Sequence, residues 1–539
     1  MTSSSCPFFQ LPRELRDAIY EQYVIVEGGY IYDFKTGKLR PANNPKHPID
    51  LAFMYTCSQV ANEMRGIALR SNTITFRTLY SPELSLRAVH FDHILNDCYE
   101  ESVYLIGHED YYLREPVEAS VRYDKRILDE VVRVFPKCQP LLQLARIVEQ
   151  ESPPYYNQEP LELMFLIMDG MVEGWGEVPS VEREIARYAL EVAFKLGYSL
   201  SWRSPRPLGT ESSIRYNIQA HDLLEIQSTL VPWAIPTERE LSNTIRKSRK
   251  STWQTHTVIG KKCYFSAAAV AIKFLHETAV STRRHLRKIV IHEDHVSVAH
   301  PECHAKGLIP FCLENPSLRI ERRLDLWHTV LCPFKHLDWV LMAQDFLCTK
   351  GSPNGFSENA SLWLVESGDL FRAGMPEKAF SLVFDGNSAP EKASKVFQRL
   401  QRDAAWQEAF DEACVRNLIP TPPLGEKRCT NFYIREHFPK IMRDMTNKSS
   451  SSIQCNFDLG SSWDIEPIID HNRNYSLEDW SSNWFDDQWE PRREDIELYW
   501  PLQSFRDEYI EEYIQEAERW RYAYEEGSFP EVSTQLDYL

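Results

Sequence analysis

Apolar residues recur at helical spacing from the start of the chain. Leu15, Ile19 and Tyr23 are four residues apart, with Ala18 on the same side, so the pattern predicts one amphipathic helix. Pro12 suits the first turn of that helix, because its missing N–H would have no partner there. The opposite face is charged and comprises Arg13, Glu14, Arg16, Asp17 and Glu21.

A second helix is expected from about Ile49 to Arg70, where apolar residues fit a 3.6-residue period. Between the two helices, the first of which should end near the glycines at 28–29, lies a polar stretch rich in turn residues. After the second helix, Thr73 to Arg77 alternates and carries β-branched residues, which predicts a short strand.

The rest of the chain mixes helical and strand patterns. Strands are expected at 286–291 and 317–321 with a short helix between them, which is one β-α-β unit and favours a parallel pair. Longer helices are expected at 126–150 (broken at Pro136), 181–200, 264–278 and 390–418. The predicted fold class is α+β and helix-rich.

The first 77 residues carry a recognisable order of motifs. Leu11-Pro12-Arg13-Glu14-Leu15 with Ile19-Tyr20 is followed by Tyr55-Thr56-Cys57-Ser58-Gln59 and then by Asn72 to Phe76. This order resembles the F-box-like N-terminus of a large group of fungal proteins, in which a Leu-Pro-x-Glu-Leu/Ile-Arg helix precedes a Cys-Arg-Gln-type helix and an Asn-x-Phe strand. The match covers residues 8–77, with an insertion at about 27–48 between the helices.

That resemblance implies a protein-interaction role. An F-box binds the linker subunit of a cullin-based ubiquitin ligase, and the remainder of the chain selects a protein substrate. Here Leu11, Pro12, Leu15 and Ile19 would present the apolar patch that docks a partner. The alternative is that these four side chains pack against the second helix, in a structural or regulatory interaction protein.

Charge divides the chain. The formal net charge is −18, but residues 456–539 hold 22 Asp and Glu against six Lys and Arg, which leaves −2 for the first 455 residues. That acidic segment also holds six of the 14 Trp: 463, 480, 484, 489, 500 and 520. We expect it to dock on the body or on a protein partner. With Lys448 to Ser452 as a linker, the predicted units are an F-box-like module (8–77), a mixed α/β body (78–447) and an acidic aromatic segment (448–539).

Two side-chain clusters suggest other chemistry. His295, His300, Cys303 and His304, with His292 and Cys312 nearby, are residue types that zinc prefers, but the default interpretation is that they are loop histidines that cap polar backbone. We therefore assign no metal or cofactor and keep zinc binding at 295–312 as an alternative. The basic run Arg246 to Lys250 suits either a nuclear-import signal or a solvated surface.

The remaining signals exclude function classes. No nucleophile elbow, zinc-protease, P-loop, dinucleotide or kinase motif is present, so an enzyme is not expected. The 12 Cys include no Cys-x-x-Cys pair, and the start resembles no signal peptide. We expect an intracellular protein of the cytoplasm or nucleus that binds neither nucleic acid nor a membrane.

Overall fold

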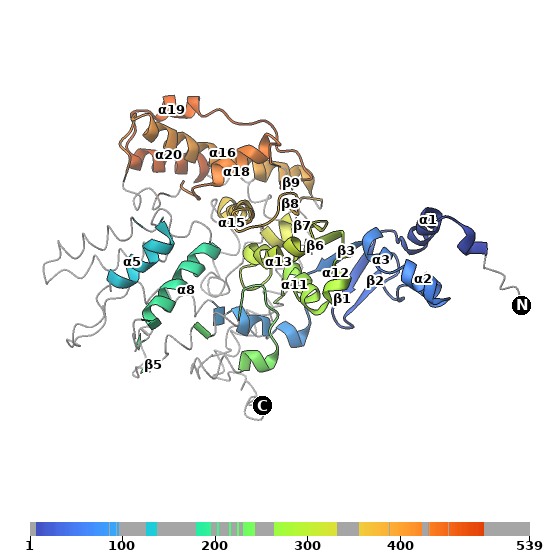
Figure 1. Cartoon of the computed structure of the whole chain (residues 1–539). Helices are drawn as coiled ribbons and strands as arrows, with labels where there is room; N and C mark the ends of the chain where they lie inside the picture. The colour runs from blue at the N-terminus through green and yellow to red at the C-terminus, as the bar shows by residue number, and fades with distance from the viewer. Residues whose placement is uncertain are drawn as a thin grey trace, which may run out of the picture.

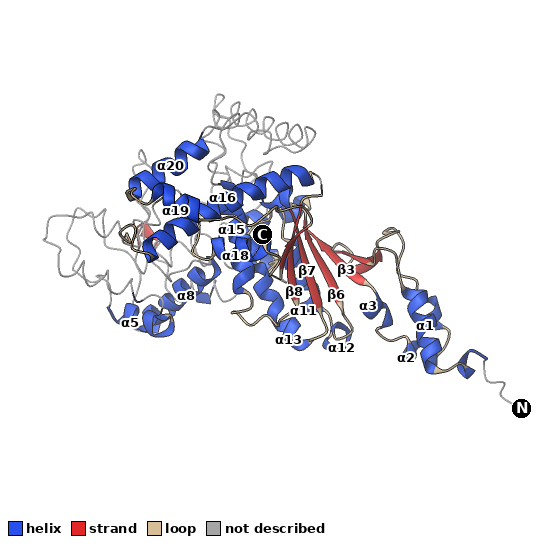
Figure 2. Cartoon of the chain, turned by 90° about the horizontal axis from the view of Figure 1, so that it is seen from above, coloured by secondary structure: helices blue, strands red, loops and turns tan. Residues whose placement is uncertain are grey.

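The computed structural model describes residues 7–85, 87–92, 94–95, 125–136, 139, 179–195, 202–203, 215–216, 224–225, 230–242, 263–330, 355–387, 389–422, 430, 432–450 and 452–489. These residues form a mixed α/β structure around a seven-stranded sheet (Figures 1 and 2). Its strands are β1 (Tyr30–Asp33), β2 (Lys38–Pro41), β3 (Thr73–Arg77), β6 (Lys288–Glu293), β7 (Arg319–Asp325), β8 (Phe380–Asp385) and β9 (Ile453–Cys455). A two-stranded sheet joins β4 (Trp202–Arg203) to β5 (Arg215–Tyr216).

The large sheet has the order β2-β1-β3-β6-β7-β8-β9, and every neighbouring pair except β1 and β2 is parallel. Parallel neighbours need a crossover, and repeated crossovers of one hand in one direction place the connecting helices on one face. The connections contain α11 (Ala267–Glu277), α12 (Val280–Arg283), η5 (Pro301–Leu308), α13 (Ile309–Glu314), η6 (Leu326–Val330), α15 (Gly355–Asp369), α16 (Pro390–Val415) and α18 (Phe438–Thr446).

Alternation along the strands shows which face the helices cover. Ile74 and Phe76 of β3, Ile289 and Ile291 of β6, and Leu382 of β8 belong to one apolar cluster with residues of α11, α13, α15, α16 and α18. The intervening residues on β3, β6 and β7 are polar or charged for the most part and only half-buried or exposed: Thr73, Thr75, Arg77, Lys288, Val290, His292, Arg319, Glu321 and Arg323. The sheet therefore has a covered apolar face and a more open polar face.

Several predicted elements are confirmed. β3 has the predicted bounds, the parallel pairing of β6 with β7 through α13 is present, and α11 and α16 lie where the helical patterns place them. Helix α5 (Lys125–Val134) confirms the first part of the helix predicted at 126–150, and α8 (Pro179–Lys195) most of the one predicted at 181–200. The rest of both ranges lies largely outside the described residues. The basic run at 246–250 lies outside the described residues.

The first 77 residues differ from expectation at two places. The predicted helix 49–70 is three short pieces, η2 (Ala52–Tyr55), α2 (Ser58–Glu63) and α3 (Ile67–Ser71). Cys57 caps α2, and Gly66 before α3 has a φ of +73°, which ends helical continuity. The polar stretch after the first helix is the β1–β2 hairpin, which extends the sheet through pairing of β1 with β3.

The described part of the acidic segment is joined to the body. The predicted linker 448–452 leads from α18 directly into β9, an edge strand paired with β8, so the sheet continues across the expected boundary at residue 448. Beyond it, α19 (Glu466–Asn472) and α20 (Leu477–Trp489) pack with α16 in an apolar cluster that contains Trp480 and Trp484. Docking on the body is thus observed as far as Trp484.

Within the described residues, no helix has the length and apolar character needed to cross a bilayer.

Candidate functional site

The N-terminal helices project from the sheet edge that carries β1 and β2 (Figures 1 and 2). They are η1 (Pro7–Gln10), α1 (Arg13–Val24), η2, α2 and α3. On α1, Leu15 is 53% exposed and Ile19 is 41% exposed, and Tyr23 is exposed one turn further along. The Leu15 and Ile19 part of the predicted apolar stripe therefore faces away from the described protein, while Tyr23 packs with one side against Phe53.

The inward face of α1 is the neighbouring stripe, one residue further along. Arg16, Tyr20 and Val24 are also four residues apart, and Tyr20 and Val24 are buried with Val60, Met64 and Ile67. Phe8 packs edge-on against the Tyr20 ring at a centroid distance of 5.7 Å, and Phe53 packs against it in a tilted arrangement at 5.5 Å. Because consecutive positions on a helix are about 100° apart, burying this stripe turns Leu15 and Ile19 outward.

Glu63, near the end of α2, fixes that rotation. Its carboxylate accepts hydrogen bonds from Arg16 Nε at 2.9 Å and Nη2 at 2.8 Å, and from the Tyr20 hydroxyl at 2.8 Å. The Arg16 guanidinium is the main reason that the pKa of Glu63 falls to about 2. Arg16 Nη1 also donates to the Leu11 carbonyl at 2.5 Å, which holds the start of α1.

Asn72 joins this helical module to the sheet. Its amide nitrogen donates to the carbonyls of Val24 and Ala68, both at 2.9 Å, and its amide oxygen accepts from Val26 N–H at 2.9 Å. One buried side chain thus supplies hydrogen-bond partners for backbone groups at the end of α1 and at the end of α3, immediately before β3. Four residues after Asn72, Phe76 of β3 is buried in the apolar cluster that includes α11.

The four predicted partner-binding residues are not equally placed. Leu15 and Ile19 are exposed on the outer stripe, Pro12 is exposed before the first turn, and Leu11 is half-buried. Two further exposed apolar side chains were missed from the sequence, Ile25 at 51% and Tyr55 at 82%. Tyr55 belongs to η2, whose Phe53 ring packs against Tyr23 at 5.3 Å between centroids. We call Leu15, Ile19, Tyr23, Ile25 and Tyr55 the outer apolar face.

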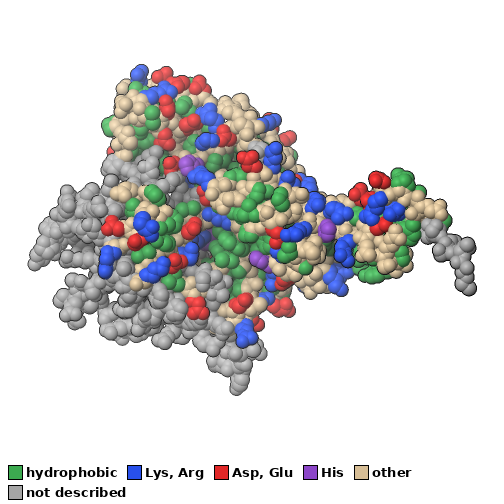
Figure 3. Space-filling view, viewed as in Figure 1, with side chains coloured by type: hydrophobic (Ala, Val, Ile, Leu, Met, Phe, Trp, Pro, Cys, Tyr) green, Lys and Arg blue, Asp and Glu red, His purple; other side chains and the backbone are tan. Residues whose placement is uncertain are grey.

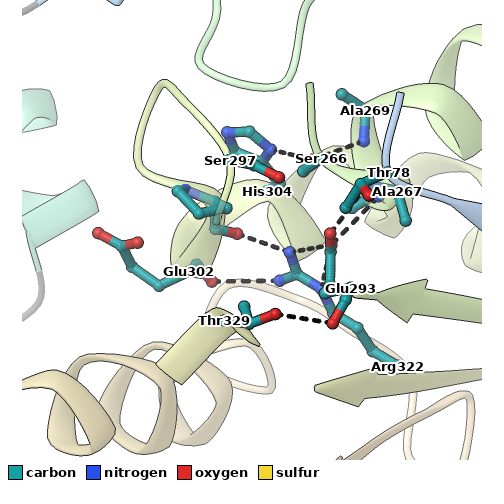
Figure 4. Close-up of polar contacts among 12 residues, drawn as sticks. Thr78, Ser266, Ala267, Ala269, Glu293, Ser297, Glu302, His304, Arg322 and Thr329 are labelled. Carbon is teal, nitrogen blue, oxygen red and sulfur yellow. Dashed lines mark hydrogen bonds and ion pairs between the residues drawn. The ribbon is translucent and has the colours of Figure 1, made fainter. Parts of the chain in front are cut away.

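A second polar cluster lies inside the body (Figure 4). Arg322 of β7 and Glu293 of β6 are each 1% exposed, and Arg322 Nη2 lies 2.5 Å from Glu293 Oε1. Glu293 also accepts from the N–H groups of Ala267 and Ala268 at the start of α11, at 2.8 and 3.2 Å. Arg322 donates to the Pro301 carbonyl at 2.7 Å. The pair is saturated by backbone, so it is a structural joint between α11, β6, β7 and η5.

The predicted zinc ligands are dispersed among other contacts. Both His304 ring nitrogens are bonded, Nδ1 to Ser266 Oγ at 2.6 Å and Nε2 to the Ala299 carbonyl at 2.7 Å, and burial lowers the pKa of His304 to about 3. The His295 ring stacks on Tyr264. Burial raises the pKa of the Cys303 thiol and brings that of Cys312 to about 12, which disfavours the thiolate that a metal needs. Among described residues, no three potential ligands form a metal-binding group.

Comparisons of the chain with protein-family models, with curated proteins and with solved structures give no match.

Proposed function

We propose that this chain is a non-enzymatic adaptor whose N-terminal module docks on the linker subunit of a cullin-based ubiquitin ligase, while the body engages a protein substrate. The observation that carries the proposal is the exposure of Leu15 and Ile19 on α1. Residues 16, 20 and 24 supply most of the internal packing of α1. On the outer stripe Tyr23 contacts Phe53, whereas Leu15 and Ile19 remain exposed.

The shape of the outer apolar face favours a helical partner. Leu15, Ile19 and Tyr23 form the i, i+4, i+8 row with which one helix packs against another. Such a row on a projecting module is what a docking helix presents, and a cluster of exposed large apolar side chains is unfavourable in water unless a partner covers it. The F-box-like motif order identifies the linker subunit as the partner to test.

The rigid support of α1 also favours partner binding. The Glu63 interactions with Arg16 and Tyr20 join α1 to α2, and Asn72 joins both ends of the helical module to the sheet. A partner that binds a preorganised face avoids the entropy cost of ordering it. The open polar face of the sheet, with its charged residues on β6 and β7, offers the body a separate surface for a substrate.

The test is binding of the purified full chain to the purified linker subunit by isothermal titration calorimetry. Leu15→Ala with Ile19→Ala should weaken binding at least tenfold, because the lost side chains are central anchors of the row. The matched control is Leu313→Ala with Val415→Ala, which removes two other exposed apolar side chains, 60% and 74% exposed, from the body. This control should bind like the wild type.

Failure of the wild-type chain to bind the linker subunit would refute the ligase role. Equal weakening by both double variants would show that the effect is not specific to α1. Circular dichroism melting of each variant verifies that the loss is not unfolding, and exposed positions should change the melting temperature little.

A further inference from the structure

Basic side chains gather around His285 where the N-terminal module meets the body. We call them the basic cluster: Arg65 and Arg70 beside and within α3, Arg284 and Arg287 after α12, Lys288 at the start of β6 and Arg319 at the start of β7. In the space-filling view, Lys and Arg side chains lie with a histidine on this part of the surface (Figure 3). Arg65, Arg284, Lys288 and Arg319 are exposed.

Two elements that are distant in sequence are brought into direct contact here. Gly66 lies against the His285 ring so closely that an added Cβ would be 2.2 Å from Cγ. Arg70 Nη1 lies 3.2 Å from His285 Nδ1. On the body side, Lys288 is the register partner of Arg319, whose N–H donates to the Arg287 carbonyl at 2.8 Å. The cluster is therefore continuous from α3 across β6 to β7.

Carboxylates compensate little of this charge. Within the described part of the chain, Lys288 is the one member that forms an ion pair, with Glu321 at 3.6 Å. Arg287 and Arg319 instead donate to main-chain carbonyls, Arg287 to Arg284 and Leu286, Arg319 to Pro316 and Leu318, at 2.7 to 2.9 Å. In both residues the donor atom is Nη1, and these bonds hold the guanidinium in place. The N–H groups on Nε and Nη2 take no part in them.

The effect on His285 shows that the positive charges act together. Burial and the charges of Arg70, Arg287 and Arg65 lower the pKa of His285 below its ordinary value. A concentration of cations this dense is notable in a chain with net charge −18. Mutual repulsion among such charges would be relieved by a bound anion.

We infer that the basic cluster binds a phosphorylated serine or threonine in a segment of a partner protein. Guanidinium groups pair with phosphate oxygens through two parallel hydrogen bonds, and a phosphate ester carries nearly two charges on three acceptor oxygens. The cluster is confined to α3 with the residue pair before it, the turn after α12 and the first residues of two adjacent strands, which suits one or two phosphates. A long nucleic acid needs basic side chains along many phosphates, whereas the first 455 residues carry a net charge of −2. The inference stands independently of linker-subunit binding.

The probe is a synthetic peptide pool with a fixed phosphoserine between random residues, and its unphosphorylated counterpart. Binding to the full chain is measured by fluorescence anisotropy, and the His285 pKa by NMR of histidine-labelled protein. We expect the phosphorylated pool to bind at least tenfold more tightly and to raise the pKa of His285, since an anion offsets the neighbouring cations. Inorganic phosphate should compete at high concentration.

The test variant is Arg65→Gln with Arg284→Gln, two exposed members whose side chains hold no structural ion pair among the described residues. It should lose at least tenfold in affinity for the phosphorylated pool. The matched control, Arg133→Gln with Lys440→Gln, removes two charges from α5 and α18 and should leave affinity unchanged.

Three results would overturn the inference: equal binding of the two pools, equal loss in both variants, or tighter binding of a single-stranded oligonucleotide than of the phosphorylated pool. The His285 titration distinguishes local binding from general charge attraction, because binding elsewhere would leave its pKa where it is.

Discussion

At the residue scale, Glu63 is the side chain on which the orientation of α1 depends. Its carboxylate accepts hydrogen bonds from the Arg16 guanidinium, from the Tyr20 hydroxyl and, at 3.1 Å, from the side-chain amide of Gln59. None of these contacts follows from the amphipathic pattern, which assigns Arg16 to the solvent side. The observed arrangement places a charged pair where an apolar stripe was expected and leaves the apolar stripe outside.

We predict that Glu63→Gln destabilises the N-terminal module by about 2 kcal/mol, because the substitution removes a charged acceptor from a half-buried guanidinium. The measurement is urea unfolding followed by tyrosine fluorescence, with Glu14→Gln, an exposed carboxylate on the same helix, as control. Because the folded pKa of Glu63 is about 2 against an ordinary 4.5, its contribution is complete above pH 4.5 and is lost as the pH falls toward 2. An unchanged unfolding midpoint for Glu63→Gln would contradict this role.

At the element scale, α20 shows how the acidic segment holds to the body. Trp480 is fully buried, and its ring packs edge-on against Trp406 and Phe410 of α16, both at 5.4 Å between centroids. The aromatic content of an acidic segment indicated docking, but its charge suggested separation. Edge-strand pairing of β9 and the burial of Trp480 and Trp484 decide in favour of attachment up to Trp484.

Trp480→Ala should cost about 3–5 kcal/mol of unfolding free energy, since it removes a large buried ring and leaves a cavity between α16 and α20. Glu478→Ala, an exposed position on the same helix, should cost less than about 0.5 kcal/mol. Chemical unfolding of both variants gives the comparison. A loss below about 1 kcal/mol for Trp480→Ala would mean that α20 contributes little to the stability of the body.

At the scale of the whole molecule, Glu366 couples the attachment of α8 to pH. This α15 carboxylate is 1% exposed and accepts from Ser180 N–H at 2.9 Å and Ser180 Oγ at 2.8 Å, at the start of α8. Burial raises its pKa to about 7, opposed by Lys306 and assisted by Glu302. The folded state therefore holds a proton that the unfolded state releases near pH 4.5.

Ionisation of Glu366 makes the free energy of unfolding depend on pH. Stability from Glu366 is fully present below pH 4.5 and falls as the pH rises to about 7, by an amount on the order of 3 kcal/mol. Glu366→Gln keeps an acceptor for Ser180 and cannot ionise. The unfolding free energy of the Glu366→Gln variant minus that of the wild type should therefore increase between pH 5 and pH 8. A pH-independent difference between the two proteins would exclude ionisation of Glu366 in this range.

Local patterns identified the elements with strong periodicity. The Ala-rich helix α11, the long helix α16 and the parallel strands β6 and β7 follow from residue spacing, because each buries one continuous face. The β1–β2 hairpin was missed because four-residue strands rich in charge and tyrosine have weak alternation. The break at Gly66 was missed because an isolated glycine inside a helical pattern is ambiguous until its φ is known.

The sequence by itself determined the apolar row at positions 15, 19 and 23 and the charge asymmetry of the C-terminal segment, since these depend on spacing and composition alone. Only the tertiary structure decided that this row faces outward, that the acidic segment begins as part of the sheet, and that arginines from residues 65–70 meet those from 284–319. The reason is physical. Periodicity shows that a helix has two faces, but which face is buried depends on partners such as Glu63, contributed from 40 or more residues away.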